Sequence, residues 1–162
     1  MIRLGFVLAL VLSGGALSGG ALSGVASAGV RDDAAAAGNQ SAAAISNYMA
    51  AWADVKPVDC SAGAGMGEHL AGDMVGAVEQ LSSGLSNPDL DTPQLFVLTE
   101  RLGGVAPYAA QGQISLADGY YRARCYAKAR EAYQVVLDTF AGAGFEVYRQ
   151  HAQTALRQLP PG

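Results

Sequence analysis

The sequence is poor in charged and aromatic residues. Only 15% of its 162 residues are charged, and ten basic residues against 14 acidic ones give a net charge of −4. A chain of this charge lacks the basic surface that neutralises nucleic-acid phosphates or holds a protein on anionic lipid. β-Branched residues are few, whereas alanine and glycine are abundant. This composition favours closely packed helices over a sheet.

Motifs that carry catalysis or bind cofactors are also missing. No Gly-x-Ser-x-Gly elbow is present, and no Gly-Lys-Ser or Gly-Lys-Thr forms a phosphate-binding loop. The two histidines are His69, with Asp73 four residues later, and His151. Metal sites need three or four protein ligands, and neither histidine has a set of that size at helical spacing. We therefore expect both histidines on helix surfaces, and we predict no enzyme activity, no metal and no cofactor.

The first 28 residues have the pattern of a secretory signal peptide. Arg3 precedes an apolar stretch over 4–12, and the segment ends in the small-x-small sequence Ala26-Ser27-Ala28. The apolar stretch is far shorter than the roughly 20 residues that span a bilayer. We expect cleavage after Ala28, a periplasmic or secreted mature chain, and no stable membrane anchor. Loss of Arg3 leaves nine basic and 14 acidic residues, a net charge of −5.

Two cysteines, Cys60 and Cys125, remain after this cleavage. In an oxidising compartment an even number of two predicts one disulfide. The loop that it closes spans roughly 65 residues, which the chain-entropy model values at about 4 kcal/mol. Two alternatives stay open: a pair of free buried thiols, or a reactive thiol at Cys125. The basic neighbours Arg122, Arg124 and Lys128 would lower the pKa of such a thiol.

Hydrophobic periodicity predicts an all-α domain over 41–162, preceded by a flexible tail over 29–40. About six short helices are expected, in antiparallel hairpins that form either a tetratricopeptide-like array or an irregular bundle. Their expected ranges are 41–55, 66–83, 92–102, 107–125, 127–140 and 145–159.

Glycine and proline set the expected boundaries. Asp91 or Thr92 should cap the third helix, and the pair Gly103-Gly104 should end it. Pro107 should open the fourth helix. Gly72 and Gly76 lie four residues apart in the second helix, where each glycine costs about 1 kcal/mol of helix propensity. We expect a neighbouring helix to approach closely there and to compensate for this cost.

The segment 116–140 resembles a tetratricopeptide repeat, a pair of antiparallel helices with small and aromatic residues at set offsets. The small positions are Ala117 and Ala129, and the aromatic positions are Tyr120, Tyr126 and Tyr133. The last helix would then be similar to the capping helix of such arrays, which extends the repeat-like region to 107–159.

The sequence departs from the family pattern at three positions. Gln113 stands in place of the usual tryptophan, Arg124 in place of a small turn residue, and Ala141 in place of a closing proline. A single repeat cannot bury its own apolar face. The earlier helices must therefore cover it.

The resemblance implies protein or peptide binding on the concave face that the first helices line. The matching outward positions are Gln111, Ile114, Asp118, Tyr121 and Arg122. Tyr121 would supply an amphipathic contact and Arg122 a partner for a carboxylate. The alternative is that Tyr121 packs against earlier helices and that Arg122 is a solvated surface charge.

The sequence therefore predicts an exported helical module that binds a protein or peptide of the cell envelope without catalysis. One alternative is a small-molecule-binding protein or enzyme with a pocket between helices, where His69 or Tyr108 would supply polar groups. Another is a structural subunit of an envelope assembly.

Overall fold

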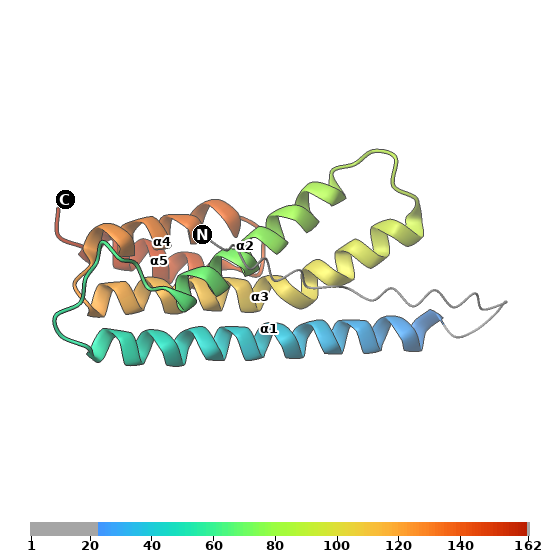
Figure 1. Cartoon of the computed structure of the whole chain (residues 1–162). Helices are drawn as coiled ribbons and strands as arrows, with labels where there is room; N and C mark the ends of the chain where they lie inside the picture. Colours follow the sequence, from blue (N-terminus) through green and yellow to red (C-terminus); the bar gives the residue numbers. More distant parts are fainter. Residues whose placement is uncertain (1–22, 162) are drawn as a thin grey trace, which may run out of the picture.

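The computed structural model describes residues 23–161 and contains five helices there (Figure 1). They are α1 (Ser23–Asp54), α2 (Met66–Leu85), α3 (Thr92–Arg122), α4 (Tyr126–Thr139) and α5 (Glu146–Gln158). No strand occurs within 23–161, so the all-α class is confirmed. Residues 1–22, which include the apolar stretch of the expected signal peptide, lie outside the described residues. No helix in the described part is long and apolar enough to cross a membrane.

α1 begins earlier than the sequence predicted. Residues 29–40, expected as a flexible tail, belong to this helix. The segment contains four consecutive alanines, which have the highest helix propensity. Gly38 is buried against α3, where an added Cβ would come within 2.8 Å of Tyr108 Cδ2. Packing against α3 therefore stabilises this segment as a helix, although the sequence of the segment has no clear apolar periodicity.

α3 begins with a capping box. The Asp91 carboxylate accepts from the Gln94 amide at 2.8 Å, and the Gln94 side chain accepts from the Asp91 amide at 3.1 Å. Pro93 lies in the first turn, where its missing N–H costs nothing. Of the two expected caps, Asp91 is the one used.

The predicted break at Gly103-Gly104 is wrong, because α3 continues through Pro107 as one helix. Proline inside a helix removes one hydrogen bond and crowds the carbonyl four residues earlier, which bends a helix. Figure 1 shows such a bend in α3. Because α3 packs against each of the other four helices, tertiary contacts outweigh the weak local propensity. The described chain therefore has five helices where six were expected.

The core lies around α3, which runs beside α1 on one side and beside α2, α4 and α5 on the others (Figure 1). Its largest fully buried side chains are Ile45, Met49, Tyr120, Tyr133, Val136 and Phe140. α4 runs back along α3, and α5 runs back along α4. The far end of the α2–α3 hairpin stands away from α1.

The closest helix contacts are at glycines other than those the sequence suggested. A Cβ added to Gly72 or Gly76 would meet nothing within 4 Å, so the expected close approach at α2 is wrong. Close approaches occur instead between α1 and α3, and at Gly67 between α1 and α2. An added Cβ on Gly119 would lie 2.7 Å from Met49 Cβ, and one on Gly112 would lie 3.0 Å from a side-chain carbon of α1. Glycine in α3 lets the two longest helices pack directly on each other.

The predicted disulfide is present. Cys60 and Cys125 are joined with an S–S distance of 1.98 Å and a Cα–Cα distance of 5.3 Å. The bond links the loop after α1 to the turn between α3 and α4, so the free-thiol alternatives do not apply. The same loop is held by Glu68, which accepts from the Tyr120 hydroxyl at 2.9 Å and from the Ala64 amide at 3.2 Å.

Candidate functional site

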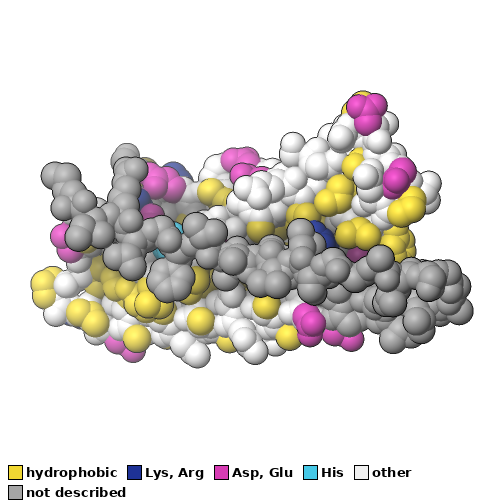
Figure 2. Space-filling view, turned by 45° about the vertical axis from the view of Figure 1, so that its right-hand side comes forward, with side chains coloured by type: hydrophobic (Ala, Val, Ile, Leu, Met, Phe, Trp, Pro, Cys, Tyr) yellow, Lys and Arg dark blue, Asp and Glu magenta, His cyan; other side chains and the backbone are white. Residues whose placement is uncertain are grey.

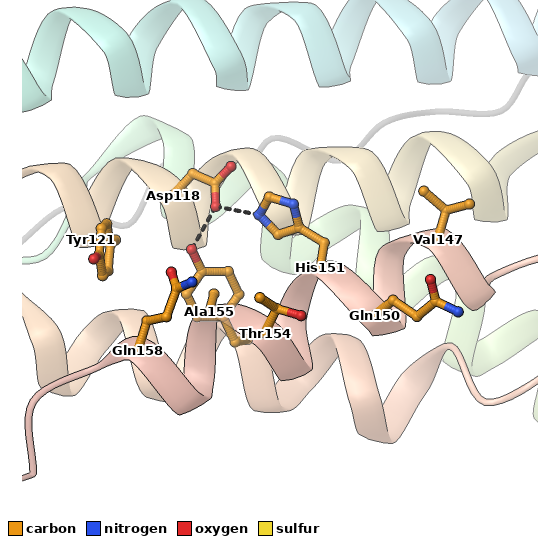
Figure 3. A pocket seen from close by; sticks show the side chains of 9 residues that line it. Asp118, Tyr121, Val147, Gln150, His151, Thr154, Ala155 and Gln158 are labelled. Carbon is orange, nitrogen blue, oxygen red and sulfur yellow. Dashed lines mark hydrogen bonds and ion pairs between the residues drawn. The ribbon is translucent and has the colours of Figure 1, made fainter.

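A groove lies between the C-terminal part of α3 and α5. It has a volume of about 470 Å³. We call it the α3–α5 groove, and Figure 3 shows it from close by. Its lining residues are Asp118, Tyr121, Tyr133, Val147, Gln150, His151, Thr154, Ala155 and Gln158.

Helical spacing directs these side chains into the groove. Asp118 and Tyr121 are three residues apart on α3, and His151 and Thr154 are three apart on α5. Ala152 is buried in the core. The neighbouring face of α5, which carries His151 and Thr154, lines the groove. Val147, near the start of α5, is 76% exposed and adds an apolar edge.

The Asp118 carboxylate is the centre of a polar network in the groove. Its Oδ1 accepts a hydrogen bond from the Tyr133 hydroxyl at 2.5 Å and lies 2.8 Å from His151 Nε2 (Figure 3). Burial raises the pKa of Tyr133 well above its usual value, and the hydrogen bond to Asp118 and the charge of Asp118 raise it further. Tyr133 therefore stays protonated and keeps donating to Asp118.

This arrangement orients His151. If Nε2 carries the proton that is donated to Asp118, Nδ1 is left to accept a hydrogen bond from a ligand. The side chains of His151 and Asp118 are 47% and 34% exposed, so a bound molecule can reach both. The Thr154 hydroxyl accepts from Arg157 at 3.0 Å. In the part of the chain that the structure describes, His151 is hydrogen-bonded to Asp118 and to no serine, threonine or cysteine.

The structure separates the five residues that the resemblance implied as partner contacts. Asp118 and Tyr121 both line the α3–α5 groove. Gln111 is exposed outside it, and Ile114 is half-buried and packs against the core. Arg122 lines a different hollow, at the end of α3. Only two of the five residues therefore share one site.

Sequence reasoning missed the roles of His151 and Tyr133. His151 looked like a surface residue of the last helix, and Tyr133 looked like a packing residue of the repeat. Their common partner Asp118 is 33 residues before His151, and no local pattern predicts a contact over that distance. The hairpin between α3 and α4 could have indicated the Asp118–Tyr133 pair, because it brings the two helices side by side.

The other histidine lies on the surface. His69 Nε2 is 3.5 Å from Asp73 Oδ2. The side chain of His69 is 77% exposed and that of Asp73 is 67% exposed. Within the described residues no group of three or more histidine, cysteine or acidic side chains could hold a metal ion. Tyr108 packs against the core and against Gly38 of α1.

A second exposed feature is the tip of the α2–α3 hairpin. Leu95, Phe96 and Val97 are between 43% and 53% exposed. Beside them, a shallow and largely apolar hollow of about 430 Å³ is lined by Leu90 and Pro93. Figure 2 shows hydrophobic and acidic side chains together on this projecting end of the molecule.

Comparison of the chain with protein-family models, with curated proteins and with solved structures found no match. The fold and the groove alone therefore define its class: an all-α, disulfide-linked domain with a polar groove between two of its helices.

Proposed function

We propose that the protein is an exported helical module that binds a protein or peptide segment in the α3–α5 groove and has no catalytic activity. The observation that carries this proposal is the Asp118–His151–Tyr133 network. It presents fixed hydrogen-bonding groups in an open groove with an apolar edge at Val147. A few oriented polar groups next to apolar surface are typical of recognition sites.

The tetratricopeptide-like interpretation of 116–140 belongs to this proposal. It is supported by Ala117 and Ala129, the two small positions, which are both fully buried. It is also supported by the place of the groove, between the first helix of the repeat-like pair and the helix that follows the pair. The family binds its partners on the face that such helices line.

Export is the other part of the proposal. The signal-peptide pattern over 1–28 supports it, and the disulfide between Cys60 and Cys125 suits an oxidising compartment. The partner would then be a protein or peptide of the cell envelope or of the extracellular space.

A peptide-display library tests the groove. Sequences selected on the wild-type protein should bind Asp118→Asn and Tyr121→Ala about tenfold more weakly, because each variant removes one contact worth about 1.4 kcal/mol. Asp73→Asn is the matched control, because it also breaks a histidine–aspartate contact on a helix surface. Selected peptides that bind all four proteins equally well would place the binding surface elsewhere.

The volume of the groove also favours a second candidate, a small-molecule-binding protein. About 470 Å³ lies within the range of roughly 300–1,000 Å³ that ligand pockets occupy. A thermal-shift screen separates the two candidates. Compounds that stabilise the wild type but not Asp118→Asn would favour a small ligand over a peptide.

A further inference from the structure

Three basic side chains line one hollow at the end of the bundle where α1 and α3 both finish. The hollow has a volume of about 350 Å³. We call it the basic hollow, and its lining residues are Ala53, Lys56, Pro57, Val58, Arg122, Ala123 and Arg124. It adjoins Cys125 and therefore the disulfide, which ties its two walls together. The proposed peptide groove is a separate site, because no residue lines both.

The charges in the basic hollow are not compensated by ion pairs. Among the described residues, Lys56, Arg122 and Arg124 have no carboxylate within ion-pair distance. The neighbouring Asp59 does not line the hollow, and its carboxylate accepts hydrogen bonds from the Ser61 amide and hydroxyl. Three of the ten basic residues of an acidic chain thus gather in one place.

The negative C-terminal ends of α1 and α3 offset only part of the positive charge of these three side chains. The C-terminal end of a helix carries roughly half a negative charge, so the ends of α1 and α3 together supply about −1. Set against the three cationic side chains of the lining, they leave an excess of about +2 in the hollow itself, whereas the nearby carboxylates of Asp54 and Asp59 lie outside the lining. An excess of this size in a concave surface attracts an anion.

The backbone at Arg124 points to a use for its side chain. The Cys125 amide donates to the Tyr120 carbonyl and the Arg124 amide to the Tyr121 carbonyl, the two hydrogen bonds of a Schellman motif. Arg124 has φ of +64°, a conformation that glycine adopts most readily. The chain thus has an arginine where glycine would make the more stable turn.

The size and walls of the basic hollow define its ligand. Guanidinium groups match the two oxygens of a carboxylate or a phosphate with paired hydrogen bonds. The hollow has roughly ten times the volume of one water molecule in the liquid, about 30 Å³, so an organic anion of several carbon atoms fits in it. Ala53, Pro57 and Val58 provide apolar contact for carbon atoms. We propose that the basic hollow binds a small organic anion with two or three negative charges.

Calorimetric titration of the full exported chain tests this proposal. The probes are citrate for carboxylate chemistry, glycerol 3-phosphate for phosphate chemistry, and sulfate as an inorganic control. We expect one of the two organic anions to bind more tightly than sulfate. Its affinity should fall about tenfold in Arg122→Gln and in Arg124→Gly, because each variant removes one charged contact.

Two measurements keep the interpretation of these variants clear. Arg124→Gly should raise the melting temperature or leave it unchanged, because glycine fits the turn, so a loss of affinity in this variant cannot come from unfolding. Arg101→Gln, which removes an exposed arginine elsewhere on α3, should bind as the wild type does. The proposal is overturned if neither organic anion binds, if sulfate binds as tightly as they do, or if Arg101→Gln weakens binding as much as the other two variants. These outcomes leave the peptide groove unaffected.

Discussion

Replacing Gly119 by alanine tests the closest contact between α1 and α3. The added Cβ would lie 2.7 Å from Met49 Cβ and would also overlap Met49 Cε. The Cε atom ends a flexible side chain and can move. The Cβ atom moves only with the backbone of α1, and Met49 is fully buried. The two helices must therefore separate locally.

The magnitude follows from two opposing effects. Overpacking of a well-packed core costs typically 1–3 kcal/mol of unfolding free energy. Because Gly119→Ala requires a shift of the α1 backbone, we expect a cost near the upper end of this range, about 3 kcal/mol. Alanine recovers about 1 kcal/mol of helix propensity over glycine. The net loss of unfolding free energy should be about 2 kcal/mol. At about 3 °C per kcal/mol for a domain of this size, the melting temperature should fall by roughly 6 °C.

Two further variants turn this into a graded series, measured by circular dichroism melting and urea unfolding. In Gly76→Ala the added Cβ has no atom within 4 Å. This variant should therefore gain about 1 kcal/mol of helix propensity, which raises the melting temperature by about 3 °C. Gly112→Ala should fall between the two, because its added Cβ meets the far end of the Ile45 side chain at 3.0 Å. Gly119→Ala with a stability equal to that of Gly76→Ala would show that α1 and α3 do not pack this closely.

The disulfide and the buried tyrosines give two more predictions. Replacing Cys60 and Cys125 by serine should lower the unfolding free energy by up to about 4 kcal/mol, because the unfolded chain loses a closed loop. Urea unfolding of the double variant and the wild type measures this change, and equal midpoints would contradict it. Burial raises the pKa of both Tyr120 and Tyr133, and a hydrogen bond from each to a carboxylate raises it further, so these phenols stay protonated in the folded state. Unfolded tyrosine loses its proton near pH 10, so the stability from this difference is complete below about pH 10 and is lost as the pH rises above it. Melting temperatures between pH 8 and pH 12 should therefore fall at the alkaline end, less steeply in Tyr133→Phe, and a flat profile would refute this account.

Local patterns were sufficient for most of the helices. The apolar residues Leu70, Met74 and Val78 of α2, the cap at Asp91, and Gly142 and Gly144 before α5 all act within a few residues, so the sequence displays them directly. The error at Gly103-Gly104 has a different origin. Whether a helix continues through weak residues depends on what packs around it, and α3 packs against every other helix.

The same distinction applies to the candidate site. The tetratricopeptide resemblance implied that Asp118 and Tyr121 share an outward face, and both lie on one helix at a spacing of three. His151 and Tyr133 reach Asp118 from other helices, so their contact depends on how the helices are placed. The basic hollow was also beyond prediction, because Lys56 comes from the end of α1 and Arg122 from the end of α3.

The sequence by itself determined the all-α class, the acidic net charge and the pair of cysteines able to bond, because composition and spacing along the chain are enough for each. Only the tertiary structure decided which glycines let helices touch, which carboxylate orients the histidine, and where the basic side chains gather. These features arise from contacts between residues far apart in the chain, and such contacts form only when the packing of α1, α4 and α5 around α3 is fixed.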